Sequence, residues 1–100
     1  MNNAYAINRS APTQARIEQA VILSVSRTLR LPAEQVTLSS RLYEDLGLDS
    51  MGLIHVNVSV EEQLGVALDI AEAPENELGT IQDLVEFVTQ RITNQEALSC

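Results

Sequence analysis

Between Thr13 and Leu29, mostly apolar residues recur at steps of three and four, the spacing of one face of an α-helix. The face comprises Ile17, Ala20, Val21, Ser24, Val25, Thr28 and Leu29. Pro32 should end the helix, because a proline pushes the residue before it out of the helical region of φ/ψ space. Residues 1–12 are polar and aperiodic, so we expect a flexible N-terminal tail.

Residues 32–49 form a long connection without a sustained period. Candidate anchors to a core are spaced along it: Val36, Leu38, Leu42, Leu46 and Leu48. The spacing of Leu42 and Leu46 is compatible with one short helical turn. Because a connection this long is unusual in a compact domain, its presence already points to function.

Residues 50–64 carry two competing patterns. An alternation typical of a strand includes Ile54, Val56, Val58 and Val60. A helical stripe in the same stretch comprises Leu53, Val56, Val60 and Leu64. Ser50 is a candidate N-cap and Gly65 a typical helix end, whereas no other segment offers a partner strand. We therefore predict a helix over 50–64.

The last third of the chain predicts one short and one long helix. Ala73-Pro74 is a candidate start for the short helix, which should end near Leu78-Gly79. Thr80 and Asp83 then form a capping arrangement, with Asp in the place that Glu or Gln usually holds. The long helix follows with an apolar face of Ile81, Leu84, Val85, Val88 and Ile92.

Together these elements predict an all-α fold: a four-helix bundle with three main helices, one short helix and a long first loop. We expect the domain to span residues 13–93 and a C-terminal tail to span 94–100. The stripe of the 50–64 helix should face inward against the first and last helices. The expected core joins Leu53, Val56, Val60 and Leu64 to Ile17, Val21, Leu84 and Val88.

Composition fits one small domain and reveals an uneven charge. The chain has 100 residues, 45% of them hydrophobic, and its 14 acids against 6 arginines give a formal net charge of −8. Residues 1–41 hold five Arg and two Glu, whereas residues 42–90 hold eleven acids and no Lys or Arg. This acidity is either an ordinary solvated face or a docking surface for basic partners.

Charge and hydropathy exclude several classes of partner and location. We find no basic stripe in the sequence that would bind nucleic acid or an anionic membrane. The longest aliphatic run, Ala20–Leu23, is far too short to span a bilayer. The N-terminus lacks the apolar segment of a secretory signal, and the lone Cys100 allows no internal disulfide. We therefore expect a cytoplasmic protein.

Ser50 is the centre of the candidate chemistry, but a hydrolase interpretation fails. A nucleophile elbow needs glycine two residues before and two after the serine. Gly52 fits, but Leu48 stands at the first position. The one histidine, His55, would lie about 140° around a helix from Ser50, too far to act as its base. We expect no enzyme activity.

A resident metal is equally unsupported. A calcium loop alternates its acids and carries glycine sixth, whereas Asp45 and Asp49 are separated by Leu-Gly-Leu. His55 and Cys100 show no ligand spacing. We predict no metal site.

A third interpretation of Ser50 needs only its hydroxyl. A helix N-terminus stabilises a phosphate ester through free N–H groups and the helix dipole, so Ser50 can be an attachment point. The run from Leu42 to Met51, LYEDLGLDSM, resembles the attachment signature of acyl carrier proteins. The resemblance continues through EEQLG at 61–65 and covers about residues 13–93.

This resemblance implies a carrier domain that holds a 4′-phosphopantetheine arm on Ser50. Asp49 would help a phosphopantetheinyl transferase recognise the site, and Met51 takes a position where leucine is usual. The protein would be a non-catalytic monomer that carries acyl groups as thioesters. Its partners would be the transferase, an acyl- or aminoacyl-loading enzyme, and downstream synthase or transferase enzymes.

Three positions depart from the family pattern: His55, Gly52 and Asn57. They favour a specialised pathway, of polyketide, peptide-type or modified fatty-acid biosynthesis, over housekeeping fatty-acid synthesis. The alternative is an unmodified acidic helical adaptor that binds basic partners, which accounts for the charge but not for the run that ends in Ser50. The mostly aliphatic core is compatible with sheltering an acyl chain and with an ordinary bundle.

A partner surface is predicted beside Ser50. Met51, His55, Val58 and Glu62 follow at steps of four, three and four, on another side of the helix from the core stripe. Met51 and Val58 would supply apolar contact, while Glu61 and Glu62 would attract basic residues of a partner.

Overall fold

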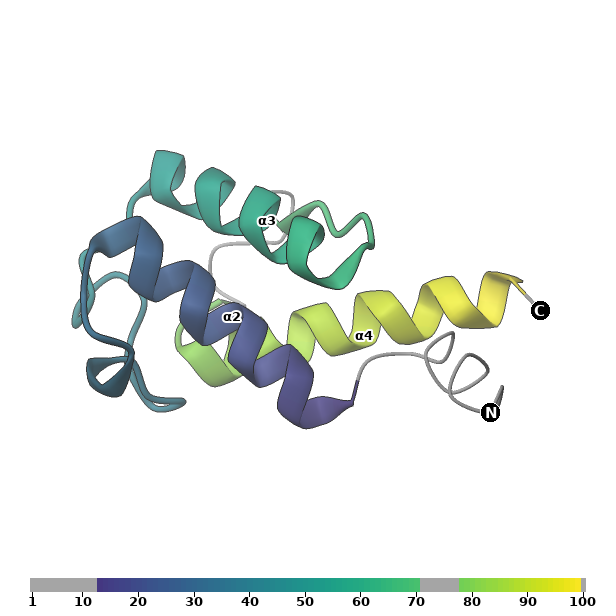
Figure 1. Cartoon of the computed structure of the whole chain (residues 1–100), viewed down its shortest axis with the longest axis horizontal. Coiled ribbons are helices and arrows are strands. Elements are labelled where there is room, and N and C mark those ends of the chain that lie inside the picture. Colours follow the sequence, from purple (N-terminus) through teal and green to yellow (C-terminus); the bar gives the residue numbers. More distant parts are fainter. Residues whose placement is uncertain (1–12, 71–77, 100) are drawn as a thin grey trace, which may run out of the picture.

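The structure, a computed structural model, describes residues 13–70 and 78–99 (Figure 1). Within these residues the secondary structure is helical: α2 (Gln14–Leu29), the 3₁₀ turn η1 (Ala33–Gln35), α3 (Ser50–Leu64) and α4 (Ile81–Ser99). The all-α prediction and the choice of helix over strand for residues 50–64 are confirmed. The expected N-terminal tail and most of the expected short helix after Ala73 lie outside the described residues.

Local side-chain chemistry sets both ends of α2. The Thr13 hydroxyl accepts a hydrogen bond from the Arg16 N–H at 3.2 Å and caps the N-terminus. At the other end Arg30 adopts the left-handed conformation, with φ of 60°, and the Ser26 hydroxyl donates to the Leu31 carbonyl at 2.7 Å. The helix therefore ends before Pro32, as predicted.

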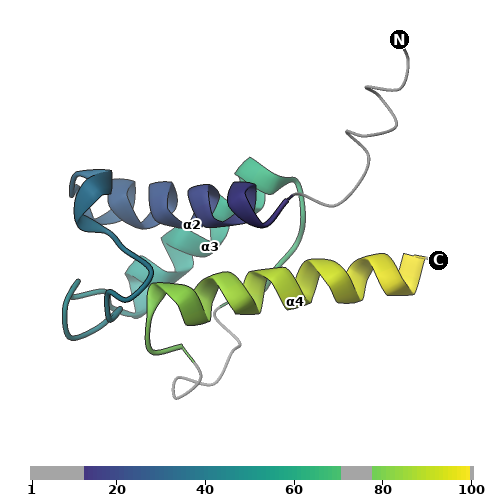
Figure 2. The ribbon, with the colours of Figure 1, turned by 90° about the horizontal axis from the view of Figure 1, so that it is seen from below.

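The core lies between the three long helices. α2 packs against both α3 and α4, and α2 and α4 run in opposite directions along the long axis of the molecule while crossing obliquely (Figures 1 and 2). Buried side chains come from every helix: Ile17, Val21, Val25, Leu53, Val56, Val60, Ile81, Leu84, Val85, Val88 and Ile92. The predicted core is confirmed except at Leu64, which is only half-buried because it stands in the last turn of α3.

The long connection before α3 is fastened to the start of α4. Its predicted anchors are buried or half-buried: Val36, Leu42 and Leu48 fully, Leu38 and Leu46 partly. Backbone hydrogen bonds tie it down, including Leu42 N–H to the Gly79 carbonyl at 2.9 Å and Ile81 N–H to the Ser40 carbonyl at 3.0 Å. The connection gathers at the end of the bundle where α3 and α4 begin (Figure 1).

The capping arrangement predicted for α4 is present. The Thr80 hydroxyl accepts from the Asp83 N–H at 3.2 Å, and the Asp83 carboxylate accepts from the Thr80 and Gly79 N–H groups at 3.1 and 2.9 Å. α4 extends to Ser99, past residue 93, where we expected the domain to end. Among the described residues, no helix combines the length and the apolar character needed to cross a membrane.

Candidate functional site

Ser50 is the first residue of α3 and is exposed to solvent. The expectation that Ser50 caps this helix is wrong, because the cap is its neighbour. Asp49 has extended backbone angles, and its Oδ1 accepts a hydrogen bond from the Gly52 N–H at 2.7 Å. Since Asp49 caps the helix, the Ser50 hydroxyl is not needed for capping.

The backbone before Ser50 is held in a tight, anchored turn. Gly47 has φ of 70°, a left-handed conformation in which a side chain is strained. Its N–H donates to the Tyr43 carbonyl at 3.1 Å, and the Leu48 N–H donates to the Leu42 carbonyl at 2.9 Å. Because Leu42 and Leu48 are both buried, the chain enters α3 from a fixed point in the core.

Gly52 is explained by a close approach. A Cβ at this position would stand 2.9 Å from Cδ1 of Leu48 and 3.1 Å from Oδ1 of Asp49. The absence of a side chain lets Leu48 lie across the first turn of α3 and lets Asp49 cap it. The departure at Gly52 therefore has a local structural reason.

The acids of the preceding turn pair with an arginine. The Asp45 carboxylate accepts from the Arg41 N–H at 2.9 Å, and the Arg41 guanidinium pairs with Glu44 at 2.6 Å and with Asp45 at 3.3 Å. The Arg41 N–H and, next, its guanidinium hold the pKa of Asp45 below its ordinary value. Asp45 thus stabilises the turn.

A metal site is not seen in the described part of the chain. No group of three or more His, Cys, Asp and Glu side chains within residues 13–70 and 78–99 is arranged to hold an ion. Cys100, one of the two ligands considered from the sequence, lies outside these residues.

Most of the predicted partner residues share the solvent-facing side of α3. Met51 and Val58 are 60% and 46% exposed, and His55 and Glu62 are exposed as well. Ile54, at 44% exposure, widens the apolar part of this face and was not assigned to it from the sequence. Its place in the strand-like alternation concealed the helical spacing of three from Met51 and four to Val58.

Glu61 makes contacts within the fold that the sequence did not predict. Its Oε2 accepts hydrogen bonds from the backbone N–H groups of Leu68 at 2.7 Å and Asp69 at 3.4 Å. Asn57 completes this arrangement, because its Oδ1 accepts from the Ile70 N–H at 2.7 Å. The two side chains fasten the segment after α3, where Leu68 and Ile70 are fully buried.

The Glu61 contacts predict a pH-dependent stability. The Leu68 N–H, with smaller contributions from Asp69 and Asn57, holds the pKa of Glu61 below its ordinary value of 4.5. A depressed folded-state pKa stabilises the protein above the unfolded value, and this stabilisation is lost as pH falls through the folded-state value. At neutral pH, Glu61→Gln should therefore lower the free energy of unfolding by about 1 kcal/mol, a modest value because solvent screens this partly exposed group.

Urea unfolding from neutral pH down to about pH 3 measures this effect, since that interval spans the ordinary carboxylate pKa. The difference in the free energy of unfolding between wild type and Glu61→Gln should become smaller as the pH is lowered. Glu62→Gln, on the exposed face one residue away, is the matched control and should follow wild type. A difference that stays constant over the whole pH range would contradict this role of the Glu61 charge.

A partly buried polar cluster joins α2 to α3. The Ser24 hydroxyl donates to the Ser59 hydroxyl at 2.8 Å, and the Gln63 amide donates to both, at 2.7 and 3.2 Å. Ser24 is fully buried. Its hydroxyl would destabilise the core without a hydrogen-bond partner, and these bonds supply the partners. Ser59 and Gln63 were not singled out in the sequence, where polar residues beside a stripe resemble solvent-facing ones.

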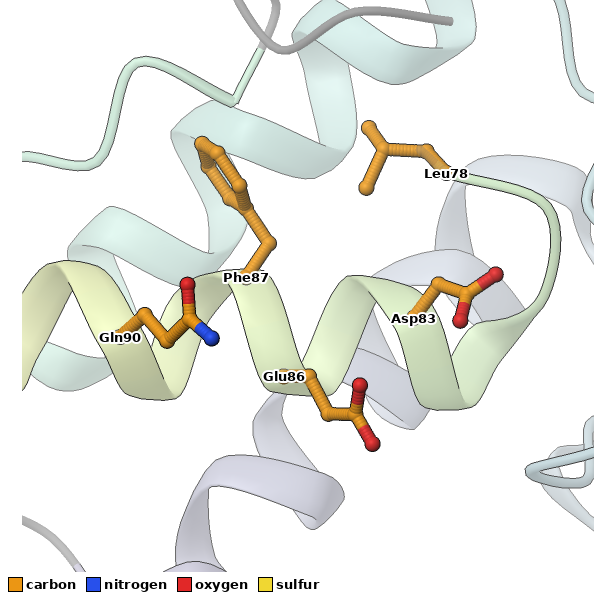
Figure 3. A pocket seen from close by; sticks show the side chains of 5 residues that line it. All are labelled: Leu78, Asp83, Glu86, Phe87 and Gln90. Carbon is orange, nitrogen blue, oxygen red and sulfur yellow. The ribbon is translucent and has the colours of Figure 1, made fainter. Parts of the chain in front are cut away.

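A half-open pocket of about 120 Å³ lies at the start of α4 and is lined by Leu78, Asp83, Glu86, Phe87 and Gln90 (Figure 3). Asp83 is already engaged as the helix cap, and the Arg91 guanidinium lies 5.1 Å from the centre of the Phe87 ring. None of the residues that the sequence singled out around Ser50 lines this pocket.

The geometry at Ser50 suits covalent attachment of a phosphate ester. The hydroxyl is exposed at the positive end of α3, where the first N–H groups of a helix lack partners within the helix. An ester on this oxygen would leave the Asp49 cap intact. The rigid turn before Ser50 would hold the attachment point at a fixed place on the surface.

Comparison with known proteins places these features in a family. The model of the family described as "Phosphopantetheine attachment site" matches residues 19–88. The chain is also similar to curated acyl carrier proteins of Rickettsia canadensis, Rickettsia rickettsii and Rickettsia felis. Each is 29% identical over 79 residues, which cover 79% of this chain and 90% of the relative.

Proposed function

We propose that this chain, which belongs to the phosphopantetheine attachment-site family and is similar to curated acyl carrier proteins, is an acyl carrier protein whose Ser50 carries the 4′-phosphopantetheine arm. The observation that carries this proposal is the position of Ser50 as an exposed first residue of α3 whose cap is supplied by Asp49. Asp49 would act in two ways, as the cap and as part of the surface that the modifying transferase recognises.

When attached, the arm supplies the thiol that holds an acyl group as a thioester. The residues of the chain then position and present it. Leu42 and Leu48, buried beneath the turn, fix the height of Ser50 above the core. The exposed side of α3 starts beside this point, so an enzyme that accepts the arm passes over it. The protein itself acts as a non-catalytic carrier.

The pathway we propose is a specialised one, of polyketide, peptide-type or modified fatty-acid biosynthesis. His55 supports this, since it is exposed on α3 where related carriers of fatty-acid synthesis often have an acid. Asn57 no longer bears on the pathway, because it anchors Ile70. A loading enzyme for acyl or aminoacyl groups and a downstream synthase would be the partners of a cytoplasmic monomer.

Intact-mass measurement tests the proposal. After incubation with coenzyme A and a phosphopantetheinyl transferase, the full chain should gain the mass of one phosphopantetheine. An unmodified mass, with a known carrier protein labelled under the same conditions, would instead favour the acidic adaptor.

The exposed face of α3 is the surface we propose for these partners, with Met51 and Val58 as apolar contacts and Glu62 as an attracting charge. Met51→Ala should slow arm transfer by about tenfold at every salt concentration, because it removes a contact that is formed in the complex. Glu62→Lys should slow transfer a few-fold at low salt and less at high salt, because an exposed charge mainly affects association. Transferase kinetics at several salt concentrations measure both effects.

Glu34→Lys is the matched control for the charge change, because Glu34 is exposed on η1 and away from α3 in sequence. It should leave the kinetics unchanged. If Met51→Ala and Glu62→Lys both fold and accept the arm at the wild-type rate, the exposed face of α3 is not the partner surface. The proposal of attachment at Ser50 would not be affected.

A further inference from the structure

One face of α2 collects positive charge in an otherwise acidic protein. Leu23 is 38% exposed, and Arg16 and Arg27 are exposed residues separated from it by seven and four positions. At about 100° per residue, both arginines lie within about 40° of Leu23 around the helix. Arg30 follows as the exposed C-cap. We call these four residues the arginine face.

The charge of this face is not neutralised by neighbouring acids in the part of the chain that the structure describes. Both ion pairs found there belong to Arg41. Arg16 donates instead to a backbone oxygen, the Gln63 carbonyl, at 3.4 Å. Glu18, the one acid of α2, lies about 140° around the helix from Leu23 and is half-buried.

We propose that the arginine face docks an acidic amphipathic helix of a protein partner. Arginine presents a planar fork of donors that matches carboxylates, and Leu23 between the arginines provides an apolar anchor. The complement is therefore an apolar residue flanked by acids. From Arg16 to Arg30 the face is about 20 Å long, at 1.5 Å per residue, which is the length of a short helix.

A folded protein partner fits better than a polyanion. The chain carries a net charge of −8, and residues 42–90 hold eleven acids without a Lys or Arg. An extended polymer such as DNA, or a wide anionic membrane, would meet that acidity together with the arginine face. A short helix contacts the arginine face alone, because α2 packs against α3 and α4 through buried side chains on its opposite side, such as Val21 and Val25.

Titration of the full-length, ¹⁵N-labelled protein with a synthetic peptide tests this docking. The probe is a helical peptide whose leucines, at steps of three and four, are flanked by glutamates. A second peptide with glutamine in place of leucine is its control. The leucine peptide should shift the backbone amide signals of α2, and the glutamine peptide should bind about fivefold to tenfold more weakly, because it lacks the apolar contact.

Two substitutions on the exposed surface probe the face without touching the core. Arg27→Gln and Leu23→Ala should each lower the affinity for the leucine peptide by about fivefold. Arg27→Gln loses an ion pair with a peptide carboxylate, and Leu23→Ala loses the apolar anchor. Arg91→Gln, which changes the net charge equally but lies on α4, should leave the affinity unchanged. If Arg27→Gln and Arg91→Gln lower the affinity for the leucine peptide equally, the proposal is overturned.

Two further outcomes would also overturn it. One is a peptide response confined to residues outside α2. The other is a larger response of the α2 amides to a short DNA duplex or to phosphatidylglycerol vesicles than to the peptide. The measurements use Ser50→Ala protein alongside wild type. Because Ser50→Ala leaves the arginine face unchanged, peptide docking on α2 is tested independently of attachment at Ser50, and the failure of one proposal does not imply the failure of the other.

Discussion

Replacing Ser50 with alanine is expected to abolish phosphopantetheine attachment completely. The hydroxyl oxygen is the atom that would form the phosphate ester, and no other group of the site can take its place. Because Ser50 is exposed and Asp49 makes the helix cap, the variant should fold and keep its stability within a few tenths of a kcal/mol. Intact mass after incubation with coenzyme A and a transferase measures the effect.

Two variants control this experiment. Ser39→Ala removes another exposed hydroxyl from the connection before α3 and should be labelled like wild type. Asp49→Ala keeps the attachment atom but loses the cap, so it should be labelled more slowly and be less stable by about 1 kcal/mol. Labelling of Ser50→Ala to the extent of wild type would place the attachment elsewhere on the chain.

Replacing Leu42 with alanine should lower the free energy of unfolding by about 2–5 kcal/mol, the usual cost of removing a buried leucine side chain. Leu42 has no exposed surface. Its N–H bonds to the Gly79 carbonyl and its own carbonyl accepts from Leu48, so it connects the start of α4 to the turn before Ser50. A cavity at this point should loosen the turn, and labelling of the folded variant should become slower.

Urea denaturation followed by circular dichroism measures the stability change. Leu64→Ala should lower the free energy of unfolding less than Leu42→Ala does, because the Leu64 side chain is only half-buried in the last turn of α3. Leu23→Ala, on the exposed side of α2, should change stability by less than about 0.5 kcal/mol. If Leu42→Ala unfolds at the urea concentration of wild type, the connection does not contribute to the core as described.

The sequence alone determined the features that depend on short-range chemistry. The apolar spacing along 13–29, 50–64 and 81–92 predicted three helices, because each must bury one face. Thr80 with Asp83 and Gly65 predicted helix ends correctly, since a cap needs only residues a turn apart. The same kind of local pattern made Ser50 the candidate attachment site, which stays a proposal. The N-cap of α3 was predicted one residue too late, at Ser50 instead of Asp49, because Asp and Ser are both good N-cap residues.

Only the tertiary structure decided what the polar residues beside the core stripe do. Glu61 and Asn57 fasten the backbone at 68–70, and Ser24 meets Ser59 and Gln63 across two helices. These partners are separated by between 7 and 39 residues along the chain, so helical periodicity carries no information about them.

The same reason applies to exposure and to close packing. Gly52 is explained by the Leu48 side chain that lies across it, and the sequence shows only its cost to the helix. The arginine face exists because packing against α3 and α4 leaves that side of α2 in solvent. A helical pattern predicts which face is apolar, but the neighbours that cover the remaining faces are set by the fold as a whole, through contacts between segments distant in the chain.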